Sequence, residues 1–175
     1  HNVEFSIDLF EKAIEYKIPV VYASSAAVYG NTMETGKYEL QPLNYYATTK
    51  VWVDQWVMNN MDRFKHIVGL RYFNVYGPNE HKPPESISMV SKFINQAKAG
   101  QPIKIFEGSE NTQRDFVHVY DVVRATIEAM ARAPGIVDVG TGSPMRILRL
   151  AQMVSVAFDA PLQFIEFPEK FKEKY

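Results

Sequence analysis

Cysteine is absent from this sequence of 175 residues. Its absence excludes disulfide bonds, a thiolate nucleophile, and zinc or iron–sulfur sites built on cysteine ligands. The sequence also lacks an apolar run near the roughly 20 residues that span a bilayer, and it does not open on a basic and then apolar signal segment. We therefore expect a cytoplasmic protein with no membrane partner. The four histidines show no metal-ligand spacing, so no metal site is expected either.

An excess of charge of one sign is missing as well. The 19 Lys and Arg residues stand against 20 Asp and Glu residues, which gives a formal net charge of -1 at pH 7. Nucleic acid binds strongly basic surfaces, so it is not an expected partner. Disorder is excluded by the 46% of hydrophobic residues together with the low net charge. The composition is typical of one globular domain, or of one domain with part of a second, in an enzyme of metabolism.

Helical and strand patterns alternate along the chain. Amphipathic helices are predicted over residues 5–17, 45–61 and 86–99, and continuous apolar runs predict buried strands over 20–23 and 67–73. This alternation predicts an α/β fold with a parallel sheet. After Gly100 the predicted elements are shorter: strands over 103–106, 116–119, 136–139 and 164–167, and helices over 121–132 and 145–158. We expect a sheet domain over 1–100 and mostly a smaller mixed α/β lobe over 101–175, with some elements returning to the sheet.

Tyr46 and Lys50 are four residues apart in the second predicted helix, so their side chains share one face. An ammonium beside a phenol lowers the pKa of the phenol and makes it an acid–base catalyst. Taken alone, this pattern favours an ordinary aromatic first turn and a solvated lysine. Ser24 and Ser25 change that balance because they end a buried strand, where catalytic groups of open α/β sheets lie. The alternative for these serines is a loop cap.

Three features in one order are far more specific than any one of them: residues 21–30, the Tyr46 and Lys50 pair, and residues 71–78. They resemble the extended short-chain dehydrogenases/reductases that act on nucleotide sugars. Further segments resemble the ADP-L-glycero-D-manno-heptose 6-epimerase family within that group: residues 106–111, 114–117 and 167–170. The resemblance covers essentially the whole chain. It implies that 1–100 is the later part of a Rossmann-like NAD(P)-binding domain and that 101–175 mostly binds substrate.

The resemblance also implies a reaction. That family oxidises the sugar at C6 with tightly bound NADP, or possibly NAD, and returns the hydride to the opposite face. By matching positions, Tyr46 is one acid–base catalyst, Lys82 is the second, and Ser25 contacts the reacting oxygen. Lys50 is the partner of the cofactor ribose. The family forms homo-oligomers, pentamers among them.

The remaining expected contacts come from the same resemblance. Cofactor contacts, besides Tyr46, Lys50 and Lys82, are expected from Asn2, Ser24 and Val75. Nucleotide-sugar contacts, besides Ser25, are expected from Asn74, Phe106, Glu107, Gly108, Ser109, Arg114 and Tyr175. Arginine suits this task because its planar fork binds phosphate oxygens in pairs.

The sequence departs from the family pattern at three places. The loop carrying Lys82 is one residue short, so that residue matches only after a gap is moved, and a solvated loop lysine is the alternative. Pro84 or Glu85 stands where the family has a small hydroxyl residue, and Lys92 stands where it has a histidine facing the substrate. The identity of the sugar therefore stays open.

Three alternatives remain at this point: a UDP-sugar 4-epimerase, a dTDP-sugar 4,6-dehydratase, and a catalytically silent protein that senses the cofactor. Ala26 and Ala27 oppose the dehydratase, because that class carries an acidic pair near the catalytic serine. The intact set of Ser25, Tyr46 and Lys50 opposes the silent sensor, which has no use for an acid–base group.

A glycine-rich turn for the cofactor pyrophosphate is missing. The Gly140-Thr141-Gly142 turn is not a substitute, because Met145 stands where a third glycine is needed. We expect the chain to be a piece of a longer protein, in which the groups that distinguish NAD from NADP precede residue 1. We therefore expect that these 175 residues do not bind a dinucleotide tightly and do not turn over a nucleotide sugar.

Overall fold

The computed structural model describes residues 2–31, 40–80, 83 and 86–167. The chain divides into two compact units, His1–Phe73 with Asp121–Val139, and Asn74–Tyr120 with Gly140–Tyr175. The chain therefore enters the second unit, returns to the first, and leaves it again. The boundary expected near residue 100 lies inside the second unit.

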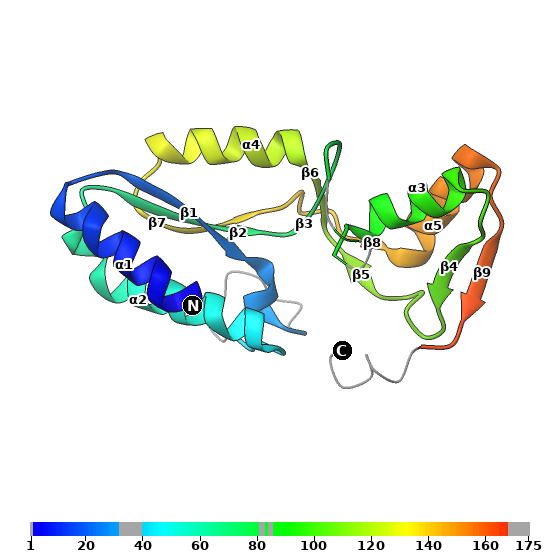
Figure 1. Ribbon diagram of the computed structural model, residues 1–175, viewed down its shortest axis with the longest axis horizontal. Helices are drawn as coiled ribbons and strands as arrows, with labels where there is room; N and C mark the ends of the chain where they lie inside the picture. Colours follow the sequence, from blue (N-terminus) through cyan, green and yellow to red (C-terminus); the bar gives the residue numbers. More distant parts are fainter. Residues whose placement is uncertain (1, 32–39, 81–82, 84–85, 168–175) are drawn as a thin grey trace. The chain divides into compact units, whose positions relative to one another are not determined.

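The first unit contains a parallel sheet with helices on both faces. Its strands are β1 (Val20–Ser25), β2 (Ile67–Tyr72) and β7 (Gly135–Val139), in the order β1-β2-β7. Helices α1 (Asn2–Glu15) and α2 (Tyr45–Asn60) cover one face, and α4 (Val119–Glu128) covers the other (Figure 1). The described part of the unit also contains the short 3-10 helices η1 (Ala26–Tyr29), η2 (Met61–Arg63) and η3 (Ala129–Ala131). The predicted α/β, Rossmann-like class is confirmed.

The central strand β2 is apolar because both of its faces are covered. Ile67, Val68 and Leu70 are almost completely buried. Gly69, in the same strand, lies opposite Tyr22 of β1. A Cβ atom at position 69 would lie 2.5 Å from Tyr22 ring atoms, so only glycine leaves room for this tyrosine. The close approach places the Tyr22 ring between the sheet and helix α2.

Aromatic rings fill the space between α1, α2 and the sheet. The Phe10 ring centre lies 5.3 Å from that of Tyr22, 5.9 Å from that of Trp56 and 6.0 Å from that of Phe64. Trp56 is partly buried and thus packs against the core of this unit. Trp52, one turn earlier, is 49% exposed.

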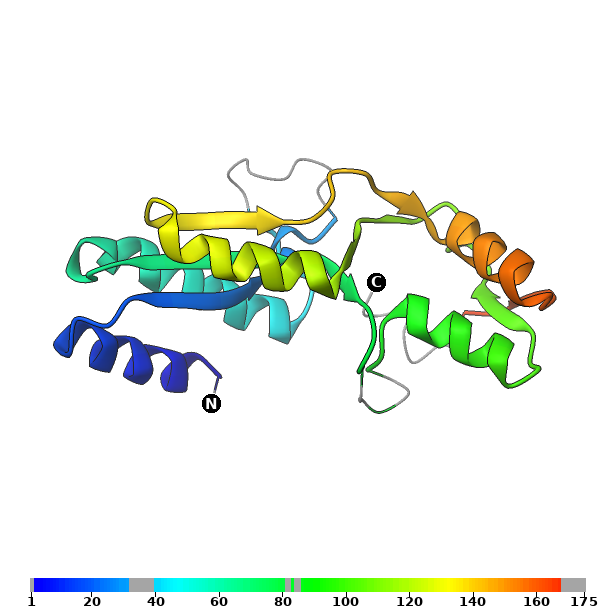
Figure 2. The same ribbon diagram turned by 90° about the horizontal axis from the view of Figure 1, so that it is seen from above.

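The described residues of the second unit form short strand pairs and two helices. Strand β3 (Asn74–Tyr76) pairs in parallel with β6 (Phe116–His118), and β4 (Ile103–Phe106) with β9 (Leu162–Ile165). Strands β5 (Gln113–Arg114) and β8 (Met145–Arg146) are antiparallel. Helices α3 (Met89–Lys98) and α5 (Ile147–Phe158), green and orange in Figure 2, pack on each other and on β4. Their shared core includes Phe93, Ile103, Ile105, Leu150 and Ala151.

The structure corrects several boundaries. Residues 74–76 form strand β3, for which the sequence predicts no strand, because three residues are too few to show a strand period. Residues 145–146 form strand β8 ahead of helix α5, and the last strand ends at Ile165 rather than continuing to 167. Within the described ranges, no helix has both the length and the apolar character to cross a membrane.

The aromatic cluster generates a stability prediction. Phe10→Ala should lower the free energy of unfolding by about 3–5 kcal/mol, because it leaves a cavity among three rings. Phe5→Ala is the matched control on the same helix, since Phe5 is 71% exposed, and it should change stability by less than about 0.5 kcal/mol. Urea denaturation followed by circular dichroism measures both values. Equal losses in the two variants would contradict the packing described for α1.

Candidate active site

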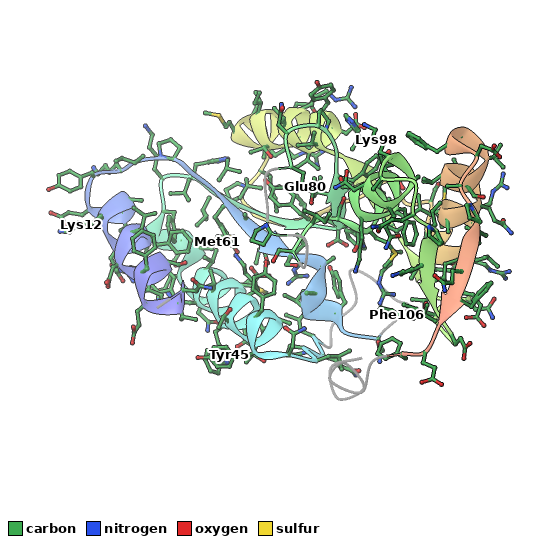
Figure 3. All side chains as sticks on the ribbon, turned by 45° about the vertical axis from the view of Figure 1, so that its right-hand side comes forward. Lys12, Tyr45, Met61, Glu80, Lys98 and Phe106 are labelled. Atoms are coloured by element: carbon green, nitrogen blue, oxygen red, sulfur yellow. The ribbon has the colours of Figure 1, made fainter. Side chains whose placement is uncertain are left out.

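Tyr46 and Lys50 lie together at the start of helix α2. Asn44 caps the helix, with its side-chain oxygen accepting a hydrogen bond from Ala47 N at 2.9 Å. Tyr45, labelled in Figure 3, is the first helical residue. The Lys50 Nζ atom lies 5.7 Å from the centre of the Tyr46 ring. The predicted neighbouring pair is therefore present, and Tyr46 is 50% exposed, so its phenol can be reached from solvent.

Lys50 also connects α2 to the end of strand β1. Its Nζ atom donates a hydrogen bond to the Ala23 carbonyl oxygen at 2.8 Å. Burial lowers the pKa of Lys50, and the negative charge of Asp54 acts in the opposite direction. The ammonium has three protons, and among the described residues it donates one, to Ala23, so two are left there to bind a ligand.

The adjacent serines have different surroundings because successive strand side chains point to opposite faces. Ser24 is 3% exposed and donates its hydroxyl proton to Asp54 Oδ2 at 2.9 Å. Ser25 is partly exposed, and its Oγ accepts a hydrogen bond from Ala27 N at 3.2 Å, which caps η1. Its hydroxyl proton has no acceptor within the described part of the chain. Ser25 can therefore donate to a ligand, whereas the expected contact of Ser24 with a cofactor stays a prediction.

Asp54 is the residue on which these elements converge, and the sequence analysis missed it. Its side chain is completely buried, and it accepts hydrogen bonds from Tyr22 OH at 3.0 Å, Ser24 Oγ at 2.9 Å and Arg71 Nε at 2.9 Å. The available signal was its spacing. Asp54 follows Lys50 by four residues and Tyr46 by eight, so it is a charged residue on the same helix face.

The network continues from Arg71 to the third strand of the sheet. Arg71 Nη1 donates to Tyr29 OH at 2.9 Å, and Tyr29 OH donates to Asp138 Oδ1 at 2.7 Å. Burial is the largest effect that raises the pKa of Tyr29, and the bond to Asp138 adds to it. Burial followed by the charge of Asp54 raises the pKa of Tyr22 well above its ordinary value. Both phenols therefore stay protonated and serve as donors.

Asn74 and Val75 lie in β3 of the second unit. Asn74 is exposed, and both its backbone N and its Nδ2 donate to the Asp115 carbonyl oxygen, at 3.0 Å and 3.1 Å. Val75 stands opposite Val117 of β6 in the parallel pair. The strand thus fixes the backbone of both residues.

The turn at Gly140-Thr141-Gly142 already binds an anion of the protein itself. The Asp115 carboxylate accepts from Thr141 N, from Thr141 Oγ1 at 2.6 Å, and from Gly142 N at 2.8 Å. These amides are the groups that a phosphate would use. Their use within the unit agrees with the prediction that this turn is not a dinucleotide-binding loop.

The segment after β4 forms a tight turn. Ser109 Oγ donates to Phe106 O at 2.7 Å, Gly108 has φ +83°, and Glu107 N donates to Ile165 O at 2.9 Å. Arg114 follows in β5, with Nη1 donating to Gln113 O at 2.8 Å. These expected substrate contacts therefore lie on backbone fixed by hydrogen bonds.

Three further expected residues need separate mention. Asn2 is exposed at the start of α1. Lys82 and Tyr175 lie outside the described residues. The described residues contain no cluster of three or more His, Asp or Glu side chains that could hold a metal ion.

Glu80, labelled in Figure 3, holds the start of helix α3. Its carboxylate accepts from Ser88 N at 2.5 Å, Ser88 Oγ at 2.8 Å and Ser91 Oγ at 2.7 Å. A carboxylate at this end also interacts favourably with the helix dipole. This contact joins the two sides of the segment in which Lys82 lies.

The chain is similar to known proteins in sequence and in fold. The model of the NAD dependent epimerase/dehydratase family matches residues 1–140. The ADP-L-glycero-D-manno-heptose-6-epimerase of Brachyspira hyodysenteriae is 36% identical over 184 residues, covering 100% of this chain and 58% of that protein. The chain therefore spans just over half the length of this curated relative.

Solved structures give the same result. The ADP-L-glycero-D-manno-heptose-6-epimerase of Helicobacter pylori matches with a TM-score of 0.87 and 34% identity, over 94% of this chain and 54% of that one. The UDP-glucose 4-epimerase of Thermus thermophilus, in complex with NAD, matches with a TM-score of 0.81 and 27% identity, over 95% and 57% of the two chains.

The buried phenols generate a prediction about alkaline pH. Tyr22 holds its proton more tightly in the folded than in the unfolded chain, so its contribution to stability is complete below the ordinary pKa of 10.0 and is lost at higher pH. Stability should therefore hold up to about pH 9 and fall as the pH rises through about 10 and above. Tyr22→Phe should make this fall shallower, while costing about 1–2 kcal/mol at pH 8 through the lost bond to Asp54. Urea denaturation across this pH range measures both effects.

Tyr16→Phe is the control for this measurement. Tyr16 is 65% exposed at the end of the first helix, so its replacement should leave both the pH slope and the stability at pH 8 unchanged. A slope that is the same in wild type and Tyr22→Phe would contradict the role given to Tyr22.

Proposed function

Because the chain belongs to the NAD dependent epimerase/dehydratase family, we propose that the protein carrying it epimerises a nucleotide-activated sugar. The proposed reaction converts ADP-D-glycero-D-manno-heptose to ADP-L-glycero-D-manno-heptose by inversion at C6. The observation that carries the proposal is the pairing of Tyr46 with Lys50, 5.7 Å from ring centre to Nζ, on the helix that packs beside the Ser25 end of β1. The choice of sugar is supported by the two relatives named for this activity, at 36% and 34% identity.

The side chains present fit the nicotinamide end of a dinucleotide. Lys50 has two ammonium protons that bond to no described residue and can bind ribose hydroxyls, and the half-exposed Tyr46 phenol lies beside it. Asn2 and Val75 are further proposed cofactor contacts. When bound, NADP supplies the chemistry of taking a hydride from the sugar and giving it back. NADP is proposed from the resemblance to ADP-heptose epimerases, and NAD is the alternative, since the matched family is NAD dependent and the Thermus thermophilus relative was solved with NAD.

Proton transfer is the task of the chain's own residues. The Lys50 ammonium favours the phenolate form of Tyr46, so Tyr46 can accept the proton of the C6 hydroxyl as C6 is oxidised. The free Ser25 hydroxyl proton stabilises the oxygen on which negative charge develops. Inversion needs a proton-handling group for the opposite face of the sugar, and Lys82 is the proposed one.

The nucleotide half of the substrate is assigned to the second unit. Arg114 presents a guanidinium group suited to two phosphate oxygens. The turn from Phe106 to Ser109 follows strand β4 and is held by hydrogen bonds to the carbonyl oxygens of Phe106 and Ile165. We assign the adenosine to this turn. Asn74 and Tyr175 complete the proposed substrate contacts.

A UDP-sugar 4-epimerase is the second candidate. It is favoured by the match to the UDP-N-acetylglucosamine 4-epimerase of Methanobrevibacter ruminantium M1, with a TM-score of 0.84 and 27% identity over 96% of this chain and 56% of that one. Lys92, exposed on α3 in place of the family's histidine, is a departure that would suit a different sugar. The matched family includes dehydratases, but Ala26 and Ala27 count against a 4,6-dehydratase because that class carries an acidic pair near the catalytic serine. The intact pair of Tyr46 and Lys50 counts against a silent cofactor sensor. The proposed protein is a cytoplasmic homo-oligomer, with the pentamer as the family precedent.

The substrate is tested by incubating the full-length protein that carries this chain with ADP-D-glycero-D-manno-heptose. NMR of the sugar should show inversion at C6, because the hydride returns to the other face. UDP-glucose and UDP-N-acetylglucosamine serve as comparison substrates under the same conditions. Turnover of a UDP-hexose with no inversion of the heptose would replace the first candidate by the second.

The acid–base assignment is tested with Tyr46→Phe and Lys82→Met in the same protein. Each should lower kcat at least about 100-fold, because each removes a group that transfers a proton, while NADP stays bound. Tyr45→Phe and Lys98→Met are matched controls, since Tyr45 is 79% exposed beside the pair and Lys98 is exposed in the last turn of α3. Full activity of the Lys82 variant would remove that residue from the proposed machinery.

A further inference from the structure

The row of side chains that contains Tyr46 and Lys50 continues along α2 to Asp54. Residues four apart on a helix lie one above the other, so these three groups occupy successive turns of one face. Tyr46 is half exposed, Lys50 reaches the Ala23 carbonyl, and Asp54 is fully buried. The exposed end of the row carries the proposed chemistry, and the buried end makes three hydrogen bonds, with Tyr22, Ser24 and Arg71.

Asp54 fixes the acceptor that Lys50 uses. Tyr22 and Ser24 point to the same face of β1 because they are two residues apart. Both donate to Asp54, at 3.0 Å and 2.9 Å, and Ala23 lies between them. The backbone on each side of the Ala23 carbonyl is therefore held by one carboxylate. That carbonyl is where Lys50 Nζ is bound, at 2.8 Å.

The charge of Asp54 acts on two cations. Arg71 Nε lies 2.9 Å from Asp54 Oδ2, and the Arg71 side chain is itself only 12% exposed. The guanidinium is shared, since its Nη1 donates to Tyr29 OH. Lys50, one turn from Asp54 on the same helix, is the second cation under its influence. Because Arg71 also binds Tyr29, it neutralises the charge of Asp54 only in part. The remaining negative potential attracts the Lys50 ammonium one turn away.

We propose that Asp54 is a positioning residue of the proposed epimerase. It keeps the Lys50 ammonium charged and bound to the Ala23 carbonyl oxygen. Lys50 is thereby held beside the Tyr46 phenol. This inference rests on the proposed function only for its effect on catalysis. A merely structural Asp54 would join α2 to β2 through Arg71, and removing it would lower stability without changing Lys50.

The first test measures the ammonium of Lys50 directly by NMR of the 15N-lysine-labelled protein, with Lys50→Arg used to assign its signal. Asp54→Asn should lower the pKa of Lys50 below the wild-type value, because the attracting charge is gone. Asp54→Glu should restore it. Asp121→Asn is the matched control, since it removes an exposed acid paired with Arg124 in a helix of the same unit. A folded Asp54→Asn protein with the wild-type pKa at Lys50 would overturn the proposal.

A second variant keeps the test decisive if Asp54→Asn does not fold. Tyr22→Phe combined with Ser24→Ala removes both donors on β1 and leaves the charge of Asp54 in place. The Lys50 ammonium protons should then exchange faster with water, because their acceptor is no longer fixed. In the full-length protein, kcat should fall roughly 10- to 100-fold with little change in KM. Unchanged ammonium exchange in the folded double variant would overturn the proposal.

The two arms separate this inference from the proposed function. The NMR measurements need no substrate, so they test Asp54 even if the wild-type protein turns over no nucleotide sugar. In that outcome the coupling of Asp54 to Lys50 stands and the proposed reaction fails. If the wild-type protein epimerises the sugar but Lys50 is unaffected in both variants, the proposed reaction stands and the role of Asp54 fails.

Discussion

The burial of the Asp54 carboxylate is the constraint on which the first unit depends. A carboxylate with no exposed surface must have its charge matched and its oxygens supplied with donors. Tyr22, Ser24 and Arg71 provide these donors from two neighbouring strands, so the contact fixes how helix α2 lies on the sheet. Gly69 follows from the same constraint, because the Tyr22 ring reaches Asp54 across the position a side chain would occupy.

Acidic side chains have similar roles in the second unit. The Asp115 carboxylate binds the amides of the turn that starts at Gly140, and Glu80 binds the first turn of helix α3. In each case the carboxylate satisfies backbone donors that a loop or a helix end leaves unpaired. These three carboxylates therefore stabilise the fold, and the proposed mechanism uses tyrosine and lysine for proton transfer.

The end of strand β1 shows how one segment serves both stability and ligand binding. Ser24 faces helix α2 and donates to Asp54, while Ser25 caps η1 and keeps its own proton available. Alternation along the strand produces this division between two residues that are identical in type and adjacent in sequence. The same alternation places Tyr22 beside Ser24, so that both flank the carbonyl bound by Lys50.

The sequence by itself determined the α/β class, most helices and strands, and the neighbouring positions of Tyr46 and Lys50, because these depend on periodicity within a few residues. Strand β3, the start of α5 after β8 and the return of the chain to the first unit needed the tertiary structure, since they depend on pairing between distant segments. Asp54 and the different surroundings of Ser24 and Ser25 were decided there as well. The partners of Asp54 lie 17 to 32 residues away in sequence, and only the packing of α2 on two strands brings them to one carboxylate.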